Sequence, residues 1–197
     1  MKNEKILELL NNNKIEELKR LLAEEIKLEG YKNKNTYKSV KNHLVKTCKN
    51  KPVLQYCDFI EEKQIFTDSY FLSSLVKEDY NPLIEKKPDD MIYPRTDTII
   101  TGIRSMCNEM LEIKSEEFTE MIHELKTQAL HNNKDYIYIE QIKRHFNIKL
   151  LEIAISTLNL NKNTDLKIYY NENKNQGILI EKSNGSLLIV LPVRVEE

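Results

Sequence analysis

A chain of 197 residues is long enough for one ordinary domain with a small appendage, or for two very small domains. Hydrophobic residues make up 40% and charged residues 31%, so we expect a real core beneath a densely ionic surface. No apolar run approaches the roughly 20 residues needed to cross a bilayer, and we expect no secretory signal. Three cysteines without metal-like spacing favour free thiols, and therefore a cytoplasmic protein rather than a membrane or secreted one.

The net charge of −1 conceals an uneven distribution along the chain. Residues 31–51 contain seven lysines and no acidic residue, whereas residues 52–128 carry sixteen acidic and eight basic side chains. Such a separation creates an electric field across a folded molecule. The lysine-rich segment is thus a candidate surface for binding anions.

Residues 1–30 are predicted to form a helical hairpin attached to the main domain, with Gly30 at its end. Asn13 and Glu16 are spaced as a capping pair for the second helix. The apolar residues at helical spacing in that helix are Ile15, Leu18, Leu22 and Ile26.

Residues 31–197 are predicted to form an α+β domain built from two units of helices and antiparallel strands. In the first unit, residues 31–100, a helix over 36–49 is followed by strands and then a long irregular connection over 78–98. The strands of this unit are expected at 53–61, 64–68 and 70–77. Tyr37, Val40, Leu44 and Cys48 form the inward stripe of the helix.

The second unit, residues 101–197, is predicted to contain two helices and several strands. Ser115 caps a helix over 116–131, and Asn147 caps a helix over 148–158. Strands are expected at 136–142, 165–170, 177–182 and 186–195, the last two joined by a turn at Ser183-Asn184-Gly185. We expect the helices to pack on one face of mainly antiparallel sheets.

The residues that catalysis requires do not form a recognisable pattern in this sequence. Four histidines lie on or beside helices without a ligand motif, and four glycines form no phosphate-binding loop. We therefore predict a binding protein with no catalytic residues, metal or cofactor. The open alternative is an enzyme with a polar pocket lined by Cys107, Glu120 and His123.

Three local patterns follow one another in the order found in a known family. Lys51-Pro52-Val53-Leu54 leads to Thr67-Asp68-Ser69-Tyr70-Phe71-Leu72; Tyr93-Pro94 precedes Asp97 and Ile99-Ile100; and a helix opened by Phe146-Asn147 precedes a final Leu191-Pro192-Val193-Arg194. Together they resemble the bacterial DNA sliding clamps, the DNA polymerase III β-clamp family, across about residues 36–195.

The sequence also departs from the family pattern. Phe71 and Ser69 stand where the family has Arg and Gly, and the closing proline of its linker is missing near Thr101. The chain has about half the length of a whole clamp subunit, so it could supply one clamp-type domain or parts of two. The resemblance therefore implies a short clamp-like protein, as from a phage or other mobile element.

The resemblance implies a ring whose inner helices meet DNA and whose outer sheets carry a groove for partner peptides. Duplex DNA bound without sequence preference, replication proteins and further copies of this chain are then the expected partners, with no membrane. The DNA-contacting residues would be Lys38, Lys41, Lys46, Lys49, Lys51, Lys143, Arg144 and Lys149. The groove residues would be Leu72, Ile189, Leu191, Pro192 and Val193. The alternative is a protein–protein adaptor of clamp-like fold that no longer encircles DNA and docks through its N-terminal hairpin, by Leu7, Leu10, Leu18 and Leu22.

Overall fold

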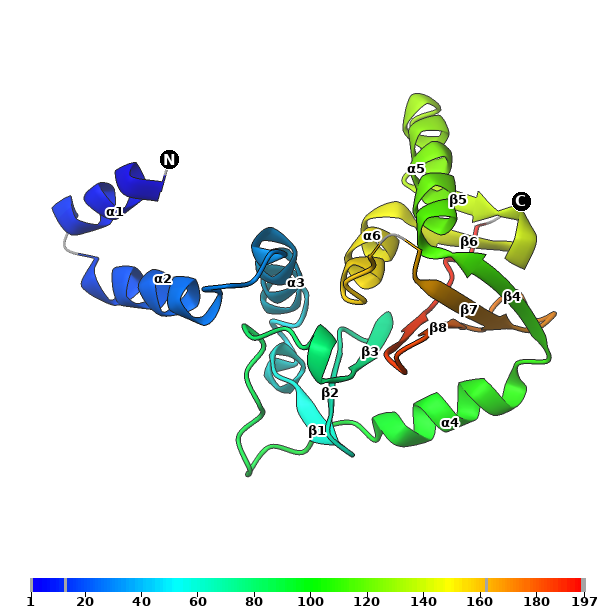
Figure 1. Cartoon of the computed structure of the whole chain (residues 1–197), viewed down its shortest axis with the longest axis horizontal. Helices are drawn as coiled ribbons and strands as arrows, with labels where there is room; N and C mark the ends of the chain where they lie inside the picture. Colours follow the sequence, from blue (N-terminus) through cyan, green and yellow to red (C-terminus); the bar gives the residue numbers. More distant parts are fainter. Residues whose placement is uncertain (1, 13, 162, 196–197) are drawn as a thin grey trace.

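The computed structural model describes residues 2–12, 14–161 and 163–195. Its N-terminal part consists of α1 (Lys2–Asn11) and α2 (Ile15–Lys27), which form a hairpin that projects from the rest of the molecule (Figure 1). The predicted hairpin is thus confirmed. The expected cap at Asn13 lies outside the described residues.

A seven-stranded antiparallel sheet forms the centre of the molecule. Its strand order is β1-β2-β3-β9-β8-β7-β4. The strands are β1 (Asp58–Ile60), β2 (Lys63–Thr67), β3 (Phe71–Leu75), β4 (Glu109–Lys114), β7 (Asp165–Tyr170), β8 (Ile178–Lys182) and β9 (Leu187–Val190). The two predicted units meet where β3 pairs with β9, with Leu72 opposite Ile189. Both units therefore share one continuous sheet, and their division stays a prediction.

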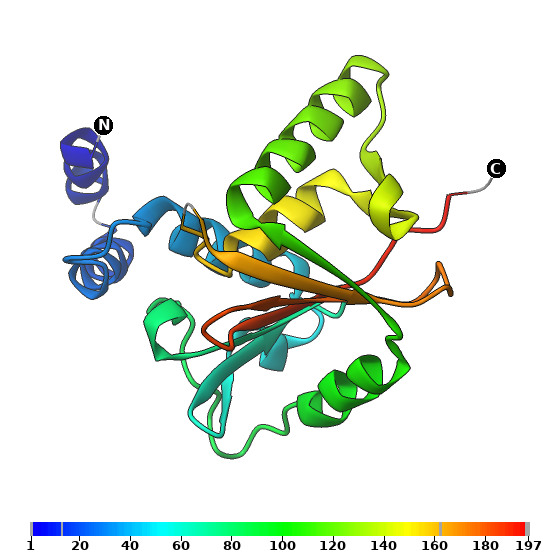
Figure 2. The ribbon, with the colours of Figure 1, turned by 45° about the vertical axis from the view of Figure 1, so that its right-hand side comes forward.

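Three helices cover one face of this sheet: α3 (Lys34–Thr47), α5 (Ser115–His131) and α6 (Ile148–Ser156) (Figure 2). The predicted α3 stripe of Tyr37, Val40, Leu44 and Cys48 is buried, as the helical spacing requires. A small sheet of β5 (Tyr136–Ile139) and β6 (Arg144–Asn147) connects α5 to α6. Because apolar residues from all three helices join one core cluster with the sheet, the α+β class is confirmed.

A fourth helix, α4 (Thr96–Met106), lies on the opposite face of the sheet, below it in Figure 2. Ile100 and Ile103 of α4 pack there against Leu179 and Ile189. The prediction that all helices share one face is therefore wrong, and the sequence patterns indicated neither α4 nor β4. Threonines, β-branched isoleucines and Gly102 give this segment weak helix propensity, so it forms through packing on the sheet.

The helix ends agree only partly with the predicted caps. The Asn147 side chain accepts a hydrogen bond from Leu150 N at 3.0 Å, as predicted. Ser115 makes no side-chain cap bond on α5; its hydroxyl instead donates to Asn161 O and accepts from Thr164 N. Ser115 therefore joins the start of α5 to the loop before β7.

The predicted hairpin between β8 and β9 is present, with Gly185 at φ +90° in its turn. A buried ion pair stabilises this turn, since Lys182 Nζ donates to both carboxylate oxygens of Asp79 at 2.7 and 2.9 Å. Asn184 and Ser186 donate to the same carboxylate. The turn is thus bonded to the short η2 helix (Lys77–Asp79), at the start of the long connection.

In the part of the chain that the structure describes, no helix has the length and apolarity needed to cross a membrane.

Candidate functional site: an apolar groove and a basic helix

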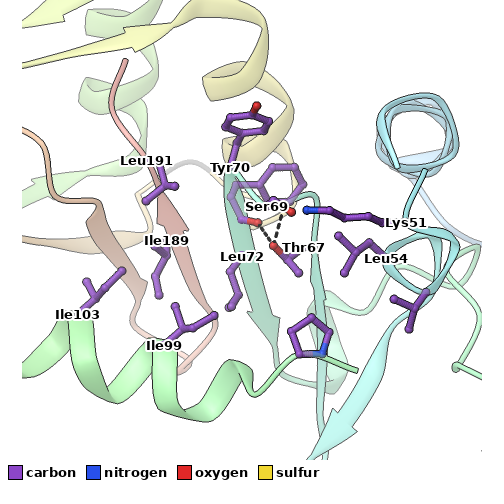
Figure 3. Close-up of a pocket in the computed structure, with 13 residues that line it drawn as sticks. Lys51, Leu54, Thr67, Ser69, Tyr70, Leu72, Ile99, Ile103, Ile189 and Leu191 are labelled. Carbon is purple, nitrogen blue, oxygen red and sulfur yellow. Dashed lines mark hydrogen bonds between the residues drawn. The ribbon is translucent and has the colours of Figure 1, made fainter. Parts of the chain in front are cut away.

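A groove of about 460 Å³ opens on the α4 side of the sheet, where β3 and β9 lie beside the start of α4 (Figure 3). Its volume falls within the range of small-ligand and peptide pockets. The lining residues are Lys51, Val53, Leu54, Thr67, Ser69, Tyr70, Phe71, Leu72, Pro94, Ile99, Ile103, Ile189 and Leu191. Most of these side chains are apolar, so the groove is built to take apolar groups from water.

The β3–β9 pairing produces the floor of this groove. Leu72 and Ile189 are opposite each other in the ladder and point to the same face of the sheet. Both are buried, and Ile103 of α4 packs against their cluster. Ile99 and Leu191 remain 44% and 37% exposed, so they offer contact area to an occupant.

A hydrogen-bonded turn between β2 and β3 makes one rim of the groove. The carboxylate of Asp68 accepts from Tyr70 N at 2.8 Å and Phe71 N at 2.9 Å, and pairs with His43 Nε2 of α3 at 2.6 Å. Thr67 Oγ1 donates to Phe71 O and accepts from Ser69 N. Ser69 lies at φ +82°, in the left-handed region where the family pattern has glycine. These bonds hold the rim in one shape.

Three of the five predicted groove residues, Leu72, Ile189 and Leu191, line the groove. Pro192 and Val193 do not line it, because the chain turns away after β9 and Val193 N donates to His145 O. The prediction missed the lining residues that η1 (Pro52–Gln55) and α4 provide. Leu54 and Pro94 stand within the quoted family patterns and could have been found there. Ile99 and Ile103, four residues apart, carried a helical signal.

The lysines predicted on α3 divide into two sets. Lys38 forms an ion pair with Glu25 of α2, and Lys41 Nζ forms one with Glu24 Oε1 at 2.8 Å. The hairpin therefore already neutralises these two cations. The sequence did not indicate that α2 lies beside α3, so these ion pairs could not be predicted. Lys46, Lys49 and Lys51 follow at the end of α3 and are exposed.

The second predicted basic group is also divided. Lys143 and Lys149 are exposed, but Arg144 is only 2% exposed. Its guanidinium donates to backbone carbonyls of four residues and to the side chain of Asn171. These carbonyls belong to Ile142, Asn171, Asn173 and Gln176. Arg144 therefore cannot reach a phosphate and is removed from the proposed DNA surface.

The polar side chains outside the groove bear on the metal and enzyme alternatives. Across residues 2–12, 14–161 and 163–195, no three His, Cys, Asp or Glu side chains are grouped as a metal would require. His123 lines a second cavity of about 370 Å³ between α3, α5 and α6, but Glu120 and Cys107 are not among its lining residues. The pocket that would support the enzyme reading is therefore not formed by those three residues.

The antiparallel sheet, the helices beside it and the groove define a clamp-like α+β fold. A solved structure with this fold is the crystal structure of Helicobacter pylori beta clamp bound to DNA ligase peptide, similar at a TM-score of 0.51 and 15% identity. The alignment covers 81% of this chain and 62% of the clamp chain, so this chain matches less than two thirds of that protein. No protein-family model and no curated protein sequence matches the chain. The likeness establishes the fold.

Proposed function

We propose that this chain is a non-enzymatic, sliding-clamp-type protein whose groove binds a short apolar segment of a replication protein. The observation that carries the proposal is the open apolar groove at the β3–β9 junction of a clamp-like fold. The similar Helicobacter pylori clamp is bound to a DNA ligase peptide, which is a partner of the proposed kind.

The groove's chemistry suits such an occupant. Burying one leucine-sized side chain contributes about 1.5–3 kcal/mol before the costs of ordering a peptide. A segment with two apolar side chains can therefore bind with modest, reversible affinity. The rim already has its turn hydrogen-bonded through Asp68, so little of that energy is spent on ordering the protein.

The test is fluorescence anisotropy with a labelled copy of the DNA ligase peptide from the Helicobacter pylori complex. We expect saturable binding that weakens at least tenfold in Leu191→Asp. An apolar peptide that covers this half-exposed position would have to strip water from the new carboxylate, which costs free energy. Ile92→Asp is the matched control, since Ile92 is 92% exposed and does not line the groove. Equal binding by wild type and Leu191→Asp would refute the groove as the site.

A second function, contact with duplex DNA, is favoured by the exposed lysines at the end of α3 and on α6. These two helices pack against each other on the face opposite the groove, so Lys46, Lys49 and Lys149 can serve one surface. Several copies, joined through the sheet-edge strands β1 and β4, would be needed to surround a duplex.

Anisotropy of a labelled duplex at low salt tests this second function. We expect two duplexes of scrambled sequence to bind equally, and binding to weaken steeply with salt and in the triple variant Lys46→Glu, Lys49→Glu, Lys149→Glu. Light scattering with the duplex present would report oligomers. If the protein binds the peptide, stays monomeric and does not bind duplex DNA, the adaptor alternative is supported instead.

A further inference from the structure

The groove has a charge polarity that specifies more than apolar character in its occupant. Lys51 is the charged side chain among the thirteen residues that line it, and no carboxylate is among them. Figure 3 shows Lys51 reaching toward Ser69 at one side, opposite Ile103 and Leu191. One side of the groove is therefore cationic and the other is apolar.

The backbone around Lys51 fixes where this cation is presented. Lys51 N donates to Cys48 O at 3.0 Å, and Lys51 O accepts from Leu54 N at 2.9 Å. These two bonds join the end of α3 to η1, so the side chain starts from a fixed point at the rim. Its exposed stem can follow the apolar wall while the ammonium stays in water.

The carboxylate of the rim turn, Asp68, already has its own partners. Asp68 is buried and already holds His43 and two backbone N–H groups. Lys38 and Lys41, by contrast, are paired with Glu25 and Glu24 of α2. Within the described residues, no ion pair involves Lys51, so its charge is open to a ligand.

We propose that the occupant is a partner-protein segment that carries a carboxylate beside its apolar side chains, and that Lys51 pairs with this carboxylate. The inference deepens the proposed peptide-binding function and rests on it. The apolar side chains lie against Ile99, Ile103 and Leu191, and the carboxylate lies at the rim beside Lys51. Lys51 is thus a residue that determines specificity, distinct from those that supply apolar contact.

The experiment compares matched peptides by fluorescence anisotropy. The probes are fluorescein-labelled, C-amidated octapeptides with a Leu-Ala-Leu-Leu core and a glutamate placed either before or after it, together with their glutamine counterparts. We expect wild type to prefer one glutamate peptide over its glutamine partner by about 3–10-fold, with the preference falling in 0.5 M NaCl.

The Lys51→Met variant keeps the apolar stem and removes the charge, so it should bind both members of the pair equally. Lys32→Met is the control: Lys32 is exposed and lies outside the groove, and its substitution should leave the preference intact. No glutamate preference in wild type, or a preference that survives in Lys51→Met, would overturn the inference while leaving apolar binding in place.

Two other results separate this inference from the proposed function. If neither acidic nor neutral peptides bind, the groove function itself fails. If the protein self-associates and Leu191→Asp abolishes the association, a second copy occupies the groove, and the assignment to a partner protein is wrong.

Discussion

The variant Arg144→Ala tests whether Arg144 stabilises the fold or contacts DNA. The guanidinium donates to four backbone carbonyls at 2.8–3.1 Å and lies 5.8 Å from the centre of the Tyr170 ring. Arg144→Ala would leave those carbonyls without their partner in a buried position. A cost of about 1 kcal/mol for each gives a loss of about 4 kcal/mol in the free energy of unfolding. For a chain of this size, that loss lowers the Tm by about 10 °C.

The assay is urea unfolding followed by circular dichroism. Arg144→Lys should recover about half of the loss, because an ammonium has three donors but lacks the planar fork. Lys149→Ala, at an exposed position on α6, should change the free energy by about 0.5 kcal/mol or less. An Arg144→Ala protein that is as stable as wild type but binds duplex DNA more weakly would refute this reasoning and restore Arg144 to the DNA surface.

Three further predictions follow from particular contacts. The double variant Glu24→Gln, Glu25→Gln should release Lys41 and Lys38 from their ion pairs with α2. Duplex DNA should then bind more tightly, and the slope of log affinity against log salt should steepen by roughly 2. An unchanged slope would show that α2 does not restrain these lysines. Burial raises the pKa of the Cys57 thiol from 9.0 to about 11. As the pH rises from about 9 to 11, the thiol therefore ionises in the unfolded chain before it does in the folded one, and the free energy of unfolding should fall. Urea unfolding of Cys57→Ser should show a smaller fall across this window, and an equal fall would contradict the assignment. Asn147→Ala should lower the free energy of unfolding by about 1 kcal/mol, because α6 loses its N-terminal cap. The control Asn35→Ala changes an exposed residue of α3 and should not lower the free energy of unfolding. Equal stability of Asn147→Ala and wild type would show that the cap contributes nothing.

The parts of the fold that could be predicted are those with a strong local pattern. Strand 165–170 was predicted at its observed bounds, because Leu166 and Ile168 alternate with exposed residues. The α3 stripe was equally clear. By contrast, the α2 stripe is largely exposed, with Ile26 at 70% and Ile15 at 54%, since apolar spacing does not say whether a neighbouring surface exists to cover it.

The parts that could not be predicted depend on contacts between distant residues. The ion pairs of Lys38 and Lys41 could not be predicted from the sequence, because their carboxylates belong to another helix, α2. Arg144 stands between Lys143 and His145, so its local sequence suggested an exposed basic patch rather than a buried anchor for carbonyls. For the groove, the family resemblance identified the β3–β9 floor, while the α4 wall required the fold.

The central claim, that the β3–β9 groove is a peptide-binding site, is tested most directly by methyl NMR of Ile- and Leu-labelled protein titrated with the ligase peptide. We predict that the methyl signals of Leu72, Ile99, Ile189 and Leu191 shift together, while those of exposed Ile92 and buried Leu158 stay in place. Shifts confined to the hairpin leucines Leu7 and Leu10, or no shifts at saturating peptide, would contradict the claim.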